Sequence, residues 1–157
     1  MGAMVSEAQR DRAVAMIAEA RTQGATVATG GRKPNIPGAF LEPTILTHVT
    51  PDMAIANEEV FGPVLSVLKF NADDDAIKIA DGTPYGRVGG VFTRDLDRAT
   101  SAARQLRAGQ VFVNEWYAGG VETPFGGYGK SGYGREKGRE ALWSYVQTKN
   151  VAIKLKG

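Results

Sequence analysis

The sequence predicts a mixed α/β fold in which a mostly parallel sheet is covered by helices on both faces. Stretches with the apolar spacing of helices alternate along the chain with short strand-like stretches. Strands that are joined through helices form right-handed crossovers, which set neighbouring strands parallel. In addition, residues 64–70 are almost continuously apolar, as is typical of a strand buried on both faces.

Capping residues mark the predicted helices. Ser6 can cap a first helix, for which Gly24 is a plausible stop. The acidic start of residues 73–80 suits the positive end of a helix dipole. Asp95 can cap a further helix that Gly109 closes. We also expect a helical turn at residues 51–57 and a helix over residues 135–145.

The other apolar stretches predict strands at residues 25–28, 40–49, 64–70, 89–93, 111–114 and 149–155. The last of these, from Lys149 to Leu155, differs from the rest. Its apolar residues Val151, Ile153 and Leu155 alternate with small or charged side chains, which is typical of a half-exposed strand. No hairpin partner follows it, so we expect a C-terminal strand of oligomerisation type with an unpaired edge that recruits partners.

The composition is that of an ordinary globular domain. Of the 157 residues, 43% are hydrophobic and 23% are charged, and the formal net charge is +2. Such values argue against an intrinsically disordered chain. The small net charge indicates neither a nucleic acid nor an anionic membrane as the main partner.

The chain contains no cysteine and a single histidine, His48. These counts exclude a disulfide framework, a thiolate nucleophile and a metal cluster of His and Cys ligands, so we expect no metal site. No apolar run approaches the roughly 20 residues of a membrane-spanning helix, and the N-terminus does not resemble a secretory signal. The absence of cysteine fits a cytoplasmic location.

Glycine is frequent between Gly119 and Gly138, where eight of the 20 glycines lie. Residues 127–132 fit the G-x-G-x-x-G dinucleotide fingerprint, which belongs at a tight strand-to-helix turn. Here a loop separates them from the preceding strand. A phosphate-binding loop would need a glycine at the position of Pro124. We therefore interpret this stretch as an irregular loop.

Residues 57–64 (NEEVFGPV) carry the most informative local pattern. Two adjacent carboxylates, Glu58 and Glu59, precede an aromatic residue, a Gly-Pro turn and the most apolar strand. This spacing alone leaves two interpretations open, a ligand site or solvated glutamates beside a core phenylalanine.

Five motifs occur in the order seen in NAD(P)-dependent aldehyde dehydrogenases. Residues 58–64 resemble the E-E-x-F-G-P-V motif of that family. The others are Tyr85-Gly86 with residues 89–93 (GGVFT), residues 111–114 (VFVN), residues 124–127 (PFGG) with 131–136 (SGYGRE), and residues 148–151 (TKNV). Together they cover nearly the whole chain, which is therefore similar to the C-terminal portion of the family's catalytic domain.

The resemblance implies that residues 1–157 form a single, incomplete catalytic domain without the Rossmann-type cofactor domain. Family members are several-fold longer, and their nucleophilic Cys, general-base Glu and oxyanion-hole Asn lie upstream of the matched portion. None of these can be carried over to a position here. We therefore expect no catalytic residue in this chain.

The same resemblance carries over two cofactor-binding roles. Glu59 matches the glutamate that accepts hydrogen bonds from the nicotinamide ribose of NAD or NADP, a task suited to an acceptor-only carboxylate. Phe61 matches the aromatic residue near the nicotinamide ring. On the substrate side, Phe125 matches a residue that lines the aldehyde pocket, and Trp116 and Tyr117 lie in the loop that shapes substrate choice.

Two positions depart from the family pattern. Arg87 follows Tyr85-Gly86, where the family usually has Leu, and Lys130 stands one position later than the usual Lys. Both lie in motifs near the site, and they leave the choice of substrate open.

The sequence thus predicts part of an enzyme that oxidises an aldehyde to a carboxylic acid with NAD(P)+ through a Cys thioester. It also predicts that this chain alone is inactive. Two alternatives stay open, a non-catalytic remnant and an interaction module that self-associates through the terminal strand. The expected partners are a small-molecule aldehyde and, through residues 149–155, a second copy of the chain.

Overall fold

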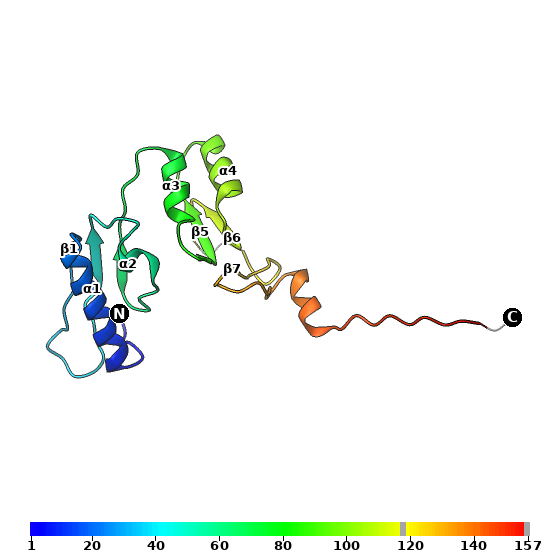
Figure 1. Cartoon of the computed structure of the whole chain (residues 1–157), viewed down its shortest axis with the longest axis horizontal. Helices are drawn as coiled ribbons and strands as arrows, with labels where there is room; N and C mark the ends of the chain where they lie inside the picture. Colours follow the sequence, from blue (N-terminus) through cyan, green and yellow to red (C-terminus); the bar gives the residue numbers. More distant parts are fainter. Residues whose placement is uncertain (117–118, 156–157) are drawn as a thin grey trace. The chain divides into compact units, whose positions relative to one another are not determined.

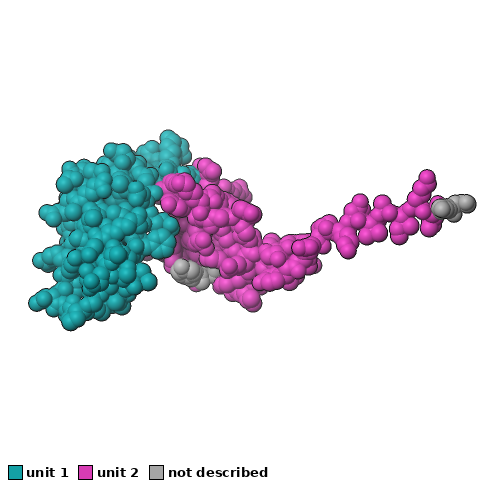
Figure 2. All heavy atoms as spheres, turned by 60° about the horizontal axis from the view of Figure 1, so that its bottom comes forward, with its two compact units in different colours: residues 1–82 teal, residues 83–157 magenta. Residues whose placement is uncertain are grey.

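The computed structural model describes residues 1–116 and 119–155, which form a mixed α/β structure (Figure 1). This confirms the predicted fold class. The chain divides into two compact units, residues 1–82 and residues 83–157, which Figure 2 colours separately. That residues 1–157 belong to a single catalytic domain stays a prediction.

Unit 1 contains the helix α1 (Glu7–Thr22) and a three-stranded sheet of β1 (Thr26–Thr29), β2 (Thr44–Thr47) and β3 (Val64–Ser66). The Ser6 hydroxyl accepts a hydrogen bond from the Gln9 amide at 3.1 Å, so the predicted cap is confirmed. The core of the unit includes Ala13, Ile17, Leu46 and Met53, which join α1 to the sheet. Two further helices, α2 (Ala54–Asn57) and α3 (Asp73–Ala80), complete the unit.

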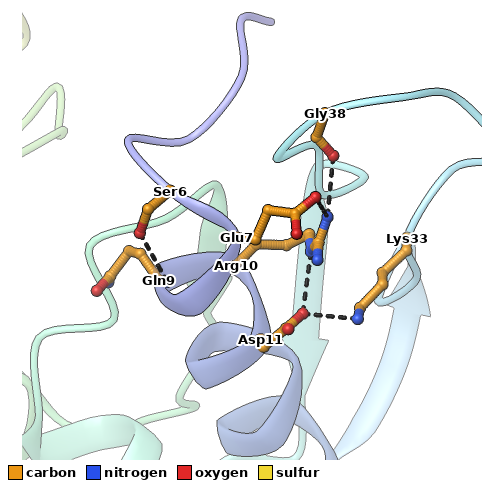
Figure 3. Close-up of polar contacts among 7 residues, drawn as sticks. All are labelled: Ser6, Glu7, Gln9, Arg10, Asp11, Lys33 and Gly38. Atoms are coloured by element: carbon orange, nitrogen blue, oxygen red, sulfur yellow. Dashed lines mark hydrogen bonds and ion pairs between the residues drawn. The ribbon is translucent and has the colours of Figure 1, made fainter.

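Arg10 ties α1 to the loop between β1 and β2 (Figure 3). Its side chain is 11% exposed, and Nη1 donates to the Gly38 carbonyl at 2.9 Å. Nε donates to Asp11 Oδ1 at 3.0 Å, and Lys33 Nζ reaches the same oxygen at 2.6 Å. The pKa of the Asp11 carboxyl is lowered, chiefly by the hydrogen bond from Arg10 and next by that from Lys33.

Unit 2 contains two small sheets. In the first, β5 (Val88–Val91) lies parallel to β6 (Gln110–Val113), and the helix α4 (Leu96–Gln105) connects them. In the second, β4 (Tyr85–Gly86) lies antiparallel to β7 (Tyr128–Gly129). Asp95 caps α4 by accepting from the Arg98 amide at 3.0 Å, as predicted. A 3-10 helix, η1 (Arg139–Tyr145), follows.

Within the described residues the strands form three sheets, and only two of the four strand pairs are parallel. The connections explain this difference from the expected, mostly parallel sheet. A parallel pair needs a crossover, usually a helix, and both parallel pairs have one between their strands. A Gly- and Pro-containing loop without a helix joins β1 to β2, and these two strands pair antiparallel.

The predicted strand at residues 64–70 is shorter than expected and is not buried on both faces. β3 ends at Ser66, and Leu65 is 58% exposed. Its partner β2 ends at Thr47, after which His48 adopts a left-handed backbone with φ of 55°. That turn takes the chain out of the ladder, so the residues after Val67 have no strand beside them in the described part of unit 1.

The predicted helix at residues 135–145 begins later than expected. The amide of Glu136 donates to the Phe125 carbonyl at 2.7 Å and the Phe125 amide donates to the Glu136 carbonyl at 2.7 Å. A residue held in such a bridge cannot join a helix, and only Arg139–Tyr145 become helical. Residues 146–155 follow as an extended trace without strand pairing to the described residues (Figure 1). The strand at 149–155 stays a prediction.

None of the helices in the described ranges is long and apolar enough to cross a membrane. Within residues 1–116 and 119–155, no group of three or more His, Cys, Asp or Glu side chains could hold a metal ion.

Candidate functional site

In unit 1, the segment that follows α2, residues 58–62, contacts α1 at two points. Arg12 Nη2 lies 3.4 Å from Glu58 Oε2, and Gln9 Nε2 donates to the Val60 carbonyl at 2.9 Å. These contacts flank Glu59 on both sides in the chain. The segment borders an open cavity of about 400 Å³. Its lining residues are Ile55, Glu58, Glu59, Val60, Phe61, Gly62, Val64 and Ser66.

The two neighbouring carboxylates differ in their surroundings. Glu58 is paired with Arg12, whereas the exposed Glu59 side chain has no ion-pair or hydrogen-bond partner among the residues that the structure describes. A carboxylate offers only acceptors, so Glu59 is suited to a ligand that carries adjacent hydroxyl groups.

Phe61 stands beside Glu59 on the same cavity, and its side chain is 73% exposed. Its backbone has φ of 51°, in the left-handed region that a bulky side chain rarely occupies. Such conformations persist only where the surrounding structure holds them, and here the adjoining Val60 carbonyl is bound by Gln9. The result is an exposed aromatic side chain next to the Glu59 carboxylate, which no other described residue contacts through a hydrogen bond or ion pair.

In unit 2, Phe125 borders a cavity of about 590 Å³. The paired hydrogen bonds to Glu136 fix the backbone of Phe125, and its ring is partly buried. The next residue must be small, because a Cβ on Gly126 would run into the Gly134 carbonyl. The glycine-rich stretch thus folds back on itself around Phe125.

Cationic side chains surround this aromatic ring. Arg87 Cζ and Lys137 Nζ each lie 5.7 Å from the centre of the Phe125 ring. Arg87 also donates from Nη2 to the Ser131 carbonyl at 3.2 Å. Arg135 lines the same cavity, but its Nη1 is used on the Gly127 and Gly134 carbonyls, at 3.0 and 2.9 Å.

Trp116 lies away from this cavity lining. Its ring packs against Phe112, with the ring centres 5.8 Å apart, and a Cβ on Gly90 would clash with it. The side chain is 52% exposed. Tyr117, which was predicted beside it, lies outside the described residues.

The structure therefore brings Glu59 and Phe61 together, and it places Phe125 and Trp116 at different positions of unit 2. Sequence reasoning missed Lys137 and Arg135 as neighbours of the Phe125 cavity. The signal for Arg87 was present, since an arginine stood in a position where an apolar residue was expected.

Comparison with known protein families shows to which family this chain belongs. The profile described as the aldehyde dehydrogenase family matches residues 1–151. The chain belongs to that family. Among curated aldehyde dehydrogenases, it is 45% identical to the betaine aldehyde dehydrogenase of Brucella anthropi, covering 99% of this chain and 33% of that protein. It is 47% identical to an aldehyde dehydrogenase of Alternaria alternata, covering 98% of this chain and 31% of that protein.

Solved aldehyde dehydrogenases share the fold. The NAD-dependent enzyme of Sinorhizobium meliloti superposes with a TM-score of 0.91 at 41% identity, over 95% of this chain and 30% of that one. A cysteine-to-alanine variant of the P. syringae indole-3-acetaldehyde dehydrogenase was solved with NAD+ and IAA. It has a TM-score of 0.93 at 43% identity, over 99% of this chain and 32% of that one. The chain spans about a third of the length of the aldehyde dehydrogenases that it matches.

Proposed function

We propose that this chain is the C-terminal part of an NAD(P)-dependent aldehyde dehydrogenase that oxidises an aldehyde to a carboxylic acid. The observation that carries the proposal is the difference between the two glutamates on the unit 1 cavity. Glu58 is engaged by Arg12, and Glu59 faces solvent without a partner among the described residues. Family membership and the NAD-dependent relatives support it.

The residues of the cavity fit a nicotinamide nucleotide. The Glu59 carboxylate would accept hydrogen bonds from the two ribose hydroxyl groups, and the exposed Phe61 ring would pack beside the nicotinamide. When bound, NAD(P)+ supplies the hydride acceptor for aldehyde oxidation. The role of Glu59 and Phe61 is to hold and orient that ring, which requires the fixed backbone that Gln9 provides.

On the substrate side, we propose that Phe125 lines the aldehyde pocket and that Trp116 and Tyr117 shape its entrance. Phe125 is suited to this by its half-buried ring on the 590 Å³ cavity. We place the protein in the cytoplasm, in keeping with the absence of cysteine from these 157 residues.

The test is a chimeric enzyme in which residues 1–155 replace the matching part of the Sinorhizobium meliloti relative. Glu59→Gln keeps the shape of the side chain and removes one charged acceptor. Hydrogen bonds to charged groups contribute about 1.5–3 kcal/mol, so we expect NAD+ affinity or the hydride-transfer rate to fall roughly tenfold or more. Glu58→Gln is the matched control and loses only an exposed ion pair, so its effect is small. Equal effects of the two changes would show that the cofactor role is wrongly assigned.

We also propose that the chain self-associates through residues 149–155. Val151, Ile153 and Leu155 are 68%, 78% and 85% exposed in the described structure. A row of alternating apolar side chains on an unpaired strand edge is a template for pairing with a second copy.

A further inference from the structure

We propose that Arg87 and Lys137 form a carboxylate-binding site on the Phe125 cavity, so that the substrate class is an aldehyde that also carries a carboxylate. This inference rests on the proposed function, because it places the aldehyde pocket at Phe125. It concerns two side chains that come together only in the fold, one beside β4 and the other next to η1.

Neither cation forms an ion pair within the described residues, although Lys137 is near enough to Glu122 to contribute, after backbone hydrogen bonds and as the smallest cause, to the lowered pKa of that carboxyl. Within the described chain, neither Arg87 nor Lys137 has a carboxylate within ion-pair distance. Among the described residues, Arg87 donates to the neutral Ser131 carbonyl, and this hydrogen bond uses only Nη2. The cavity lining holds three cationic side chains, with Arg135, against the single carboxylate of Glu136. The lining is therefore positive overall.

The arrangement suits a ligand with an apolar body and an anionic end. The two cations lie at the same distance of 5.7 Å from the Phe125 ring, where cation–π attraction helps to hold them. A planar guanidinium matches the geometry of a carboxylate and leaves further donors free for it. The ring itself offers the apolar surface for an aliphatic chain, and about 590 Å³ leaves room for both parts.

The direct test is an NMR titration of the 157-residue chain with glutarate, compared with glutaramide of the same length at equal ionic strength. We expect saturable shifts of the backbone amides near residues 125–137 with glutarate and none with glutaramide. Arg87→Gln keeps an amide donor for Ser131 but removes the charge, and should weaken glutarate binding about fivefold. Lys137→Asn should weaken it similarly, because Asn tolerates the left-handed backbone of this residue (φ 56°).

Arg94→Leu is the matched control, since Arg94 is exposed and does not line the cavity; it should leave glutarate binding unchanged. Equal shifts with glutarate and glutaramide, or equal losses for Arg87→Gln and Arg94→Leu, would overturn the site. In the chimeric enzyme, Arg87→Gln should lower the kcat/KM ratio of 5-oxopentanoate over pentanal. A chimera that oxidises pentanal while the glutarate titration stays flat would refute the carboxylate site alone. Glutarate binding in a chimera that oxidises neither aldehyde would refute the proposed function instead.

Discussion

The side chain of Asn114 pairs with the backbone of Thr93 through two hydrogen bonds. The Thr93 amide donates to Asn114 Oδ1 and Asn114 Nδ2 donates to the Thr93 carbonyl, both at 2.8 Å. The two residues lie just beyond the paired ends of β5 and β6, so the side-chain amide extends the parallel ladder. It does so from a left-handed backbone with φ of 56°, a conformation in which asparagine is more common than most residues.

Replacing Asn114 tests this extension of the ladder. Asn114→Ala removes both hydrogen bonds and leaves a residue that tolerates the left-handed backbone less well than asparagine, so we expect a loss of about 2 kcal/mol in unfolding free energy. Asn114→Gly also removes both hydrogen bonds, but glycine adopts the left-handed backbone without strain. It should therefore lower the unfolding free energy less than Asn114→Ala does. Urea unfolding followed by tryptophan fluorescence reports on unit 2, because both tryptophans lie there. An Asn114→Ala variant as stable as the wild type would contradict the prediction.

The acid sensitivity of unit 1 should depend on Asp11. A carboxyl whose pKa is lower in the folded chain stabilises the fold above its unfolded pKa of about 3.9. That contribution is lost as the pH falls through the folded value. A ¹³C NMR titration should therefore place the Asp11 pKa below that of an unfolded peptide.

Substitution of the two cations separates their contributions to this pKa. Arg10→Met should raise the Asp11 pKa most, since the hydrogen bond from Arg10 is the largest cause of its lowering, and Lys33→Met should raise it less. Lys33 is 48% exposed, so its removal leaves the fold intact and keeps the test valid if Arg10→Met unfolds. An Asp11 pKa that does not respond to either change would contradict the assignment.

The chain by itself should not oxidise aldehydes. The reaction needs a nucleophile that forms a tetrahedral adduct from which hydride can leave, and no cysteine is present to supply a thiolate. We expect no protein-dependent rise in reduced-nicotinamide absorbance with aliphatic or aromatic aldehydes and either NAD or NADP. The chimeric enzyme serves as the positive control. Activity that survives repeated purification of the chain would reveal a catalytic centre in these residues.

Self-association should depend on the apolar face of residues 149–155. Ile153→Lys puts a charge into that face, so it should shift the sedimentation of the chain toward the monomer at high micromolar concentration. Ala152→Lys places the same charge on the opposite face of the alternating pattern and should leave association unchanged. A wild-type chain that sediments as a monomer would rule out this interface.

Local patterns in the sequence predicted several elements, and the resemblance to a family motif supplied the candidate residues Glu59 and Phe61. The helix at residues 73–80 has the predicted bounds, and the caps at Ser6 and Asp95 are confirmed, because these features depend on neighbours within a few residues. The order of the five motifs identified the aldehyde dehydrogenase family. Glu59 and Phe61 could both be found from the sequence because they lie two positions apart within the single motif of residues 58–64.

Contacts between distant residues were decided only by the tertiary structure. Nothing in the local pattern of Glu58 shows that Arg12 pairs with it, while Glu59 has no partner in the part of the chain that the structure describes. The start of the last helix was missed because the bridge between Phe125 and Glu136 competes with helical hydrogen bonds. Arg87 and Lys137 meet on one aromatic ring because the glycine-rich stretch folds back, and such a meeting depends on backbone path rather than on spacing along the chain.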